Sequence, residues 1–195
     1  KQDVDYVLTT TEIVRMIRKS GIVFDKVEIE AADVPFGIGS GSGVIFGVTG
    51  GVTEAVLRRL QQGHNRVDME SIKKSGVRGD DGIKVLTYNY NGREIKAAVV
   101  NGLANADKVL QQIKNHEAEY DFVEVMACRR GCIMGGGQPV NAGPRTRKAR
   151  MKGLYDTDVN TQIKKSNENP MILSLYDTLL KGKEHELLHR NFSGK

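Results

Sequence analysis

Two cysteines are the side chains of this sequence best suited to metal or redox chemistry. Cys128 and Cys132 are the only cysteines among 195 residues, and Arg129, Arg130 and Gly131 separate them. Thiolates are soft ligands that prefer zinc, copper(I) and iron–sulfur clusters, so a single pair indicates one metal or redox site and not a disulfide scaffold. If a helical turn joins the two residues, both sulfur atoms project to one side.

The neighbours of the cysteines favour a reactive or ligating pair. Two adjacent arginines suit an anionic thiolate or an anionic cluster, whereas a buried inert cysteine gains nothing from them. The apolar run Phe122–Met126 precedes the pair, and the three glycines Gly135–Gly137 follow it. An α/β sheet commonly presents its ligand at such a place, the carboxyl end of a strand.

Spacing alone leaves other interpretations open. Two buried structural cysteines are the usual alternative, and a thiol redox switch, a local disulfide and a zinc site are further ones. The histidines show no metal-site spacing to the cysteines. Only His185 and His189 are spaced as i and i+4, and no acidic third ligand can be placed beside them.

A second glycine-rich segment lies upstream, with seven glycines in residues 36–51. We expect a loop here, a short buried strand over Val44–Phe46, and a helix that includes Thr53–Leu60. Glycine before a helix suits phosphate, or any ligand that approaches the main chain closely. No Gly-Lys-Ser or Gly-Lys-Thr ending follows, so nucleotide binding is the weaker interpretation.

The central patterns predict an α/β scaffold. Asn91–Gly92 predicts a hairpin between Lys84–Tyr90 and Arg93–Val100. Asn105 is expected to cap the next helix, and Tyr120–Met126 to form a buried strand. A strand, a helix and a strand in this order indicate a crossover unit. The expected fold class is therefore α/β, with a mixed or parallel sheet flanked by helices.

Helices are expected at both ends of the chain. Thr9 and Glu12 predict a capping box for an N-terminal helix. The C-terminal tail is expected to be helical, with one helix near 146–155 and a second that opens at Asn169-Pro170. We therefore expect an α/β lobe over residues 1–140 and a helical extension over 141–195 that packs on it.

The positive charge is concentrated in one segment. The net charge is +5, and the segment from Arg145 to Lys165 holds seven basic and two acidic residues. Because Tyr155 is the only aromatic residue there, nucleic-acid binding is not expected. A solvated helix face and a docking site for an acidic protein such as an electron carrier both stay open.

The sequence predicts a cytoplasmic protein without membrane contact. No apolar run approaches the ~20 residues needed to cross a bilayer, and residues 1–5 contain no apolar signal-peptide core. The first residue is a lysine, so we expect the chain to be a piece of a longer protein.

The residues around the cysteines form a long motif. It reads Glu124-Val125-Met126-Ala127-Cys128-x-x-Gly131-Cys132-x-x-Gly135-Gly136-Gly137-Gln138-Pro139. This motif closely resembles the last of the three signature motifs of the iron-only (FeFe) hydrogenases. Further similarity to that family, in order and at family spacing, is found at 5–10, 43–55, 167–170 and 185–189.

The resemblance implies an iron–sulfur centre. In that family a 4Fe-4S cubane, held by cysteines, is joined through one cysteine sulfur to a two-iron unit with carbonyl, cyanide and dithiolate ligands, and together they form the H-cluster. By position, Cys128 resembles a cubane ligand and Cys132 the bridging thiolate. The residues that resemble the surroundings of the cluster are Phe46, Gly47, Met126, Gly135, Gly136, Gln138 and Pro139.

The resemblance also implies a missing part. The two earlier signature motifs, which hold the other two cubane cysteines and the cysteine that passes protons to the iron, are absent from this sequence. No residue of this chain is therefore expected to transfer protons, and two cysteines cannot hold the cubane alone. A missing N-terminal part of the catalytic domain, or a partner chain, is expected to supply the rest.

The function implied by the resemblance is that of one part of an iron-only hydrogenase. The parent enzyme would interconvert protons plus electrons with dihydrogen, with an acidic carrier such as ferredoxin as electron partner, and this chain alone would be inactive. The alternative is a non-catalytic hydrogenase-like iron–sulfur scaffold, sensor or interaction module. Arg129 and Arg130 depart from the family, which most often has proline and glycine at these two positions.

Overall fold

The computed structural model describes residues 4–31, 33, 38–61, 69–79, 81–139 and 143–189. His64 and the first two residues of the glycine-rich segment, 36–37, lie outside the described residues. In chain order the helices and strands are α1 (Thr10–Lys19), η1 (Phe24–Lys26), α2 (Gly41–Val44), η2 (Ile45–Gly47), α3 (Gly51–Leu60), α4 (Met69–Lys74), β1 (Ile83–Tyr90), β2 (Arg93–Asn101), α5 (Leu103–Lys114), β3 (Phe122–Met126), η3 (Cys132–Met134), α6 (Pro144–Asn160), η4 (Ser166–Glu168), α7 (Pro170–Asp177) and α8 (Glu184–Leu188), where η marks a 3-10 helix.

A mixed sheet in the order β1-β2-β3 forms the centre, which confirms the α/β class. The strands β1 and β2 are antiparallel, and both turn residues between them have positive φ, 51° at Asn91 and 80° at Gly92. A tight hairpin turn of the primed type needs this conformation. The strand β3 runs parallel to β2, and α5 is the crossover between them, so the predicted hairpin and crossover are both confirmed.

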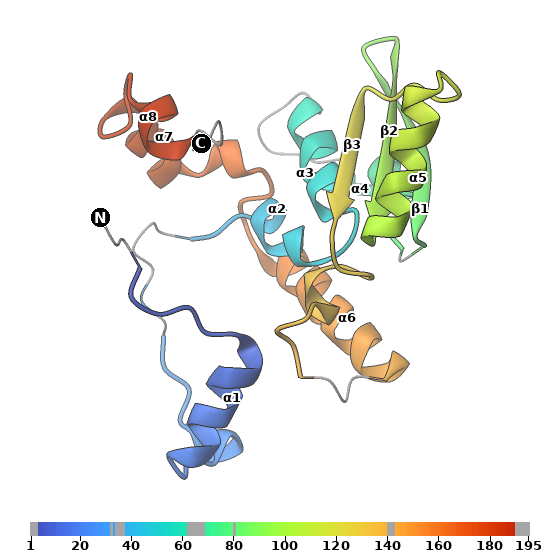
Figure 1. Cartoon of the computed structure of the whole chain (residues 1–195). Helices are drawn as coiled ribbons and strands as arrows, with labels where there is room; N and C mark the ends of the chain where they lie inside the picture. Colours follow the sequence, from blue (N-terminus) through green and yellow to red (C-terminus); the bar gives the residue numbers. More distant parts are fainter. Residues whose placement is uncertain are drawn as a thin grey trace.

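Helices cover both faces of the sheet (Figure 1). Side chains alternate along a strand, so successive residues of β2 face opposite layers. Ala97 and Val99 pack in one layer with Leu57 of α3 and Ile72 of α4. Ala98 and Val100 pack in the other layer, in a cluster that includes residues of α5.

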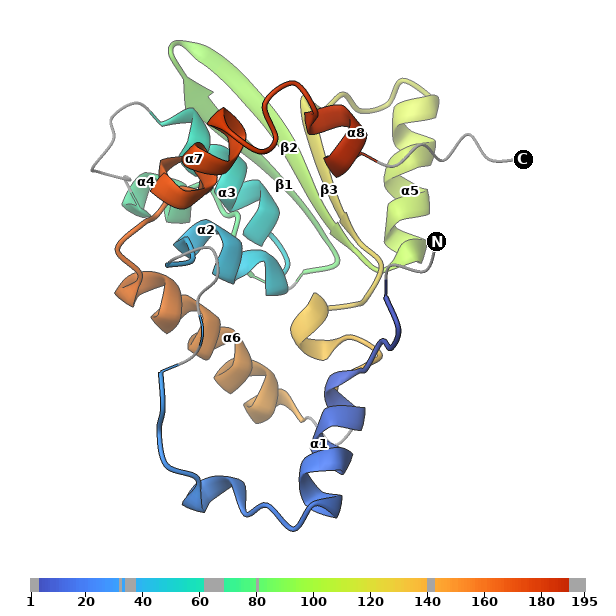
Figure 2. The same ribbon diagram turned by 90° about the vertical axis from the view of Figure 1, so that its left-hand side faces the viewer.

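A third apolar cluster lies away from the sheet, where α6 passes under the shorter helices (Figure 2). Its buried members are Ile45, Val48 and Ile133, and α6 adds Met151, Leu154 and Tyr155. This cluster joins η2, η3 and α6, three segments that are far apart in the sequence.

Two local expectations are wrong. Val44–Phe46 is helical and not a strand, because Ser40 caps α2 by accepting a hydrogen bond from the Gly43 N–H at 3.2 Å. A three-residue apolar run does not distinguish the two conformations. The helix α5 begins at Leu103 with Gly102 as its N-cap, and the predicted cap Asn105 instead donates from Nδ2 to the Asn101 carbonyl at 2.8 Å.

The two ends of the described chain differ from the centre in burial. The capping box of Thr9 and Glu12 is present as predicted, yet α1 contains no buried residue. The helix α7 begins at Pro170 with Asn169 as the cap, again as predicted, but most of its large apolar side chains are exposed. The division into residues 1–140 and 141–195 stays a prediction. Within the described residues, no helix has the length and apolar character of a membrane span.

Candidate metal centre

The two cysteines lie in a loop that follows β3. Met126, the last residue of β3, pairs in register with Asn101 of β2, and Cys132 begins η3. Both cysteines are exposed and free, so the alternative of two buried structural cysteines is wrong. The condition of a helical turn between them is not met, because φ is +69° at Arg130 and +81° at Gly131. A right-handed helix does not contain such residues.

Gly131 brings the cysteine loop against the upstream glycine-rich segment. It is buried, and a Cβ placed on it would lie 2.9 Å from both the Gly47 carbonyl oxygen and the Thr49 nitrogen. The main chains of two segments separated by more than 80 residues therefore touch here. This contact places η2, which carries Phe46 and Gly47, next to the cysteines.

Phe46 and Gly47 lie at this contact, and Met126 ends the strand that leads into the cysteine loop. A Cβ on Gly47 would lie 2.8 Å from Leu154 Cδ1, so the absence of a side chain at Gly47 lets α6 approach. Met126 is half-buried, and its carbonyl accepts a hydrogen bond from the Gly102 N–H at 2.8 Å. Phe46 keeps 45% of its surface exposed. An apolar side chain as large as Phe46, beside the cysteine loop, can help to keep water away from a bound group.

The residues from Gly135 to Pro139 continue the loop toward α1. A Cβ on Gly135 would lie 3.4 Å from Cys128 Sγ, whereas no described atom lies within 4 Å of a Cβ on Gly136. Gln138 donates from Nε2 to Thr10 Oγ1 at 3.2 Å, and Pro139 is half-buried. Gly135 therefore packs against a sulfur atom, and the main chain of its neighbour Gly136 is open.

The start of α1 binds the end of this motif. The carbonyl of Gly137 accepts hydrogen bonds from the N–H of Thr11 at 3.0 Å and from its hydroxyl at 3.1 Å. A Cβ on Gly137 would lie 3.1 Å from Thr9 Cβ. Residues 5–10 and 124–139, two of the stretches that resemble the same family, are distant in the sequence and meet in the structure.

Glu124, the first residue of the motif, fixes β3 to α3. Its buried carboxylate accepts hydrogen bonds from the Gly50 N–H at 2.8 Å and from the N–H and hydroxyl of Thr53 at 2.7 Å each. A carboxylate at the first turn of a helix also interacts favourably with the helix dipole. The strand that leads to the cysteines is therefore held against the helix that follows the glycine-rich segment.

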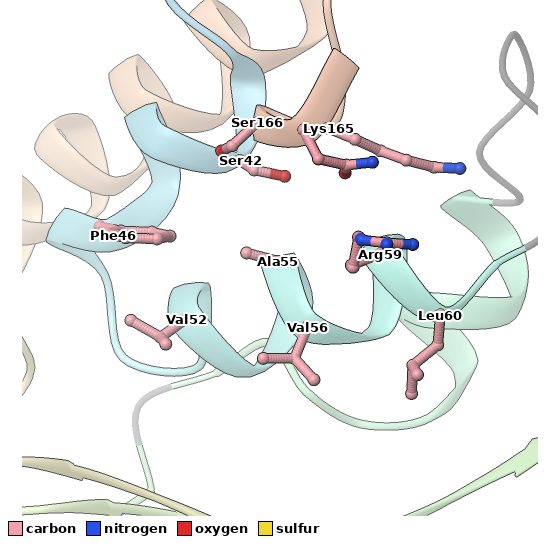
Figure 3. A pocket seen from close by; sticks show the side chains of 10 residues that line it. Ser42, Phe46, Val52, Ala55, Val56, Arg59, Leu60, Lys165 and Ser166 are labelled. Atoms are coloured by element: carbon pink, nitrogen blue, oxygen red, sulfur yellow. The ribbon is translucent and has the colours of Figure 1, made fainter. Parts of the chain in front are cut away.

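A pocket of about 300 Å³ opens beside Phe46 (Figure 3). Figure 3 shows Phe46 at one end of the pocket and the Arg59 and Lys165 side chains at the other. Val52 and Val56 of α3 line its wall. Sequence reasoning missed Val52, although its place in the first turn of a helix that follows two glycines is a usable signal. The lining residues come from 42–60 and 165–167, and none belongs to the cysteine loop, so Phe46 is the residue that the pocket shares with the candidate site.

A buried ionic cluster attaches α6 to α3. Arg58 is completely buried and donates from Nη1 and Nη2 to the two carboxylate oxygens of Asp158, at 2.7 Å each, and from Nη2 to Glu54 at 2.6 Å. Burial alone would lower the pKa of Arg58, but the hydrogen bonds and charges of Asp158 and Glu54 raise it above its usual value. Arg58 therefore stays charged inside the protein.

The burial of Asp158 shows that the basic segment from Arg145 to Lys165 is not exposed along its whole length. Arg145, Lys148 and Lys152 are exposed, in agreement with a solvated helix face. Lys165, by contrast, is buried and donates to the Gln61 carbonyl at 3.0 Å. Part of the segment thus serves internal packing, an alternative that the charge count did not suggest.

The histidine pair has no third partner in the part of the chain that the structure describes. The rings of His185 and His189 lie 4.6 Å apart between centroids. Among the described residues, no three His, Cys, Asp or Glu side chains are grouped so that they could hold a metal ion. The cysteine pair is therefore the candidate with the better ligand chemistry.

The residues at the cysteine loop fit part of an iron–sulfur site. Two exposed thiols supply soft ligands, and the open backbone at Gly136 gives room for a bulky inorganic group. A 4Fe-4S cluster needs four protein ligands. The loop therefore fits half of such a site, and the other ligands must come from outside the described residues.

Two family models match the chain. Residues 1–136 match the iron only hydrogenase large subunit, C-terminal domain. Residues 144–195 match the iron hydrogenase small subunit. The boundary between the two matches falls just before α6.

Comparisons with single proteins agree with these matches. The chain is similar to iron hydrogenase 1 of Clostridium pasteurianum, with 38% identity over 96% of this chain and 34% of that protein. It is also similar to the cytosolic Fe-S cluster assembly factor narfl of Xenopus tropicalis, with 28% identity over 94% of this chain and 39% of that protein. A solved structure of the FeFe-hydrogenase HydA1 from Chlamydomonas reinhardtii matches with a TM-score of 0.67 and 33% identity, over 94% of this chain and 54% of that chain.

Proposed function

Because this chain belongs to the iron-only hydrogenase family, we propose that it is part of a hydrogenase catalytic domain whose complete form interconverts protons plus electrons with dihydrogen. The chain spans about a third of the length of the curated hydrogenase that it matches, and about half of the solved hydrogenase chain. The observation that supports this function best is the exposed cysteine pair beside the open main chain of Gly136.

Each residue of the site has a proposed role. Cys128 would ligate the 4Fe-4S cubane, and Cys132 would bridge the cubane to the two-iron unit. The bound H-cluster supplies the redox chemistry of hydrogen. Phe46 and Met126 would shield the two-iron unit from water, and Gly47 would let α6 close behind it.

The remaining residues would shape the space around the cluster. Gly135 and Gly136 would let the cluster approach the main chain. Gln138 and Pro139 would join this end of the site to α1 through the contact of Gln138 with Thr10. No residue of this chain is assigned the transfer of protons.

The partners follow from the incomplete site. The rest of the catalytic domain, or a partner chain, would supply the other two cubane cysteines and cover the apolar side of the site. An acidic electron carrier such as ferredoxin is the proposed donor. The exposed side chains of Arg129, Arg130 and Lys148 offer positive charge for it. The cytoplasmic location stays a prediction.

The similarity to cluster assembly factors defines the alternative, a non-catalytic scaffold, sensor or interaction module. The identity is 38% to a hydrogenase and 28% to an assembly factor, so the enzyme is the better supported proposal. One experiment separates the two. The chain is assembled with the missing part of its domain and with the maturation machinery, and infrared spectra and hydrogen evolution are measured.

Carbonyl and cyanide bands together with hydrogen evolution are the expected result. Bands without turnover would favour the scaffold or sensor, and the absence of both would overturn the hydrogenase proposal. The variant Cys132→Ser is expected to abolish attachment of the two-iron unit, because serine does not provide the soft bridging ligand. If Cys132→Ser kept that unit, the assignment of the bridge would be wrong.

A further inference from the structure

We propose that Asn101 and Arg150 are positioning residues that hold the cysteine loop in the shape that a cluster requires. Neither residue belongs to the cysteine motif, and they come from segments that match two different family models. The inference rests on the function proposed above, because it treats Cys128 and Cys132 as ligands of one iron–sulfur centre.

The loop needs support from outside. Arg130 has φ of +69°, in the left-handed region that residues with a side chain rarely adopt. Such a conformation persists only when the surroundings hold it in place. The loop's own main-chain hydrogen bond between the cysteines, from the Gly131 N–H to the Cys128 carbonyl, is long at 3.3 Å.

Asn101 provides support between the two cysteines. Its Oδ1 accepts a hydrogen bond from the Arg130 N–H at 3.2 Å, and its Nδ2 donates to the Asp81 carbonyl at 2.9 Å. The side chain is only 2% exposed and stands at the end of β2. Because both ends of the amide are occupied, Asn101 fixes the strained residue of the loop to the sheet.

Arg150 provides support on the other side of Cys132. It reaches from α6 and donates from Nη1 to the carbonyl of Ile133 at 2.7 Å. Ile133 directly follows Cys132, and its buried side chain belongs to the cluster that joins η2, η3 and α6. The helix that matches the small subunit thus contacts the main chain next to a candidate ligand.

The two contacts enclose Cys132. Asn101 binds the N–H two residues before it, and Arg150 binds the carbonyl one residue after it. Partners that orient a metal ligand without touching the metal typically change metal affinity by about 10–100-fold. The same magnitude is expected here, although these partners act through the main chain.

The first test uses the iron-free chain. Arg150→Met is expected to speed hydrogen exchange of the Gly135 amide, which donates to the Cys132 carbonyl at 3.0 Å, about fivefold, as for the loss of one supporting hydrogen bond, with the rate followed by mass spectrometry. The matched control is Lys152→Met, which removes the same charge from the same helix at an exposed residue that is ion-paired with Asp156. Arg150→Lys keeps a donor and should restore part of the wild-type rate.

The second arm of this test addresses Asn101. Asn101→Ala is expected to speed hydrogen exchange of the Arg130 amide about fivefold, because that amide loses its acceptor. Asn105→Ala is the control, since among the contacts described the Asn105 side chain donates to the main-chain carbonyl of Asn101 and not to the Arg130 amide. If Asn101→Ala does not fold, as judged by circular dichroism, the positioning role is tested with the Arg150 variants alone.

The third measurement uses the chain assembled with the rest of its domain and loaded with iron and sulfide. The electron paramagnetic resonance signal of the reduced 4Fe-4S cluster should fall about tenfold in Arg150→Met, and Lys152→Met should match the wild type. If Arg150→Met and Lys152→Met gave equal resonance signals and equal exchange rates of the Gly135 amide, the positioning role would be overturned. A wild-type protein that takes up no iron would instead overturn the proposed function, while the exchange rates of the iron-free chain would still test the positioning.

Discussion

Single glycines of the two glycine-rich segments differ in what occupies the place of the missing side chain. In the upstream segment, a Cβ on Gly41 would lie 2.0 Å from Asp158 Oδ1, and one on Gly51 would lie 1.8 Å from the Ile45 carbonyl oxygen. In the downstream segment, no described atom lies within 4 Å of a Cβ on Gly136. Gly41 and Gly51 therefore make room for the protein itself, as Gly137 does downstream for Thr9, whereas the place of a side chain at Gly136 is open.

This difference shows why glycine content alone does not identify a ligand site. A glycine permits close approach, but only the structure shows whether protein or open space occupies the place of the missing side chain. Gly131 combines both segments, because it belongs to the cysteine loop and packs against Gly47 and Thr49. Three substitutions test the comparison, in order of their expected effect on the free energy of unfolding.

The largest loss of folding free energy is expected at Asp158, the buried carboxylate that packs against Gly41. Asp158→Ala leaves Arg58 buried with only one strong acidic partner, and the loss of one partner of a buried pair costs about 3–5 kcal/mol. The free energy of unfolding is measured with urea. Asp156→Ala, on the same helix but exposed, is the control and should change it by less than about 0.5 kcal/mol. Similar values for both variants would show that the ionic cluster does not hold α6.

The second effect is expected at Gly51, where helix propensity and packing oppose each other. Alanine is favoured over glycine in a helix by about 0.5–1 kcal/mol, yet the Ile45 carbonyl lies where the methyl group would go. Gly51→Ala should therefore destabilise by about 1–3 kcal/mol in urea unfolding. Gly153→Ala, in α6 with no described atom near its Cβ, should stabilise by about 0.5–1 kcal/mol. A stabilising Gly51→Ala would contradict the close approach.

The smallest effect on folding is expected at Gly136. Gly136→Ala should change the free energy of unfolding by less than about 0.5 kcal/mol, since its Cβ meets no described atom. In the assembled domain, however, the same methyl group should weaken cluster binding by about 1–3 kcal/mol, as for an overfilled site. Iron content and the resonance signal of the cluster measure this. An unchanged iron content would show that the cluster does not approach Gly136.

The parts of the fold set by local chemistry were predictable from the sequence. The hairpin follows from Asn91–Gly92, and the first turn of α1 follows from Thr9 and Glu12, because each pattern contains its own hydrogen-bond partners. The parallel pairing of β3 with β2 followed from the order of strand, helix and strand. The cysteine pair and its glycines were also identified from the sequence.

The features that depend on distant contacts were not predictable. The cysteine loop is not helical because Arg130 adopts a left-handed conformation, which the contact with Asn101 supports. Likewise, the charge pattern from Arg145 to Lys165 gave no sign that Asp158 and Lys165 are buried, because their partners Arg58 and Gln61 are about 100 residues away. Short sequence windows do not contain such pairs.

The apolar side chains exposed on α1 and α7 have a practical consequence for how the chain is made. Met16 of α1 and Leu173 and Tyr176 of α7 each expose between 45% and 53% of their surface. Apolar side chains left exposed on two helices favour contact with another polypeptide. The assembled domain used for the cluster measurements should therefore be made by co-expression of this chain with the proposed remainder of the domain, so that these side chains are covered as the domain folds.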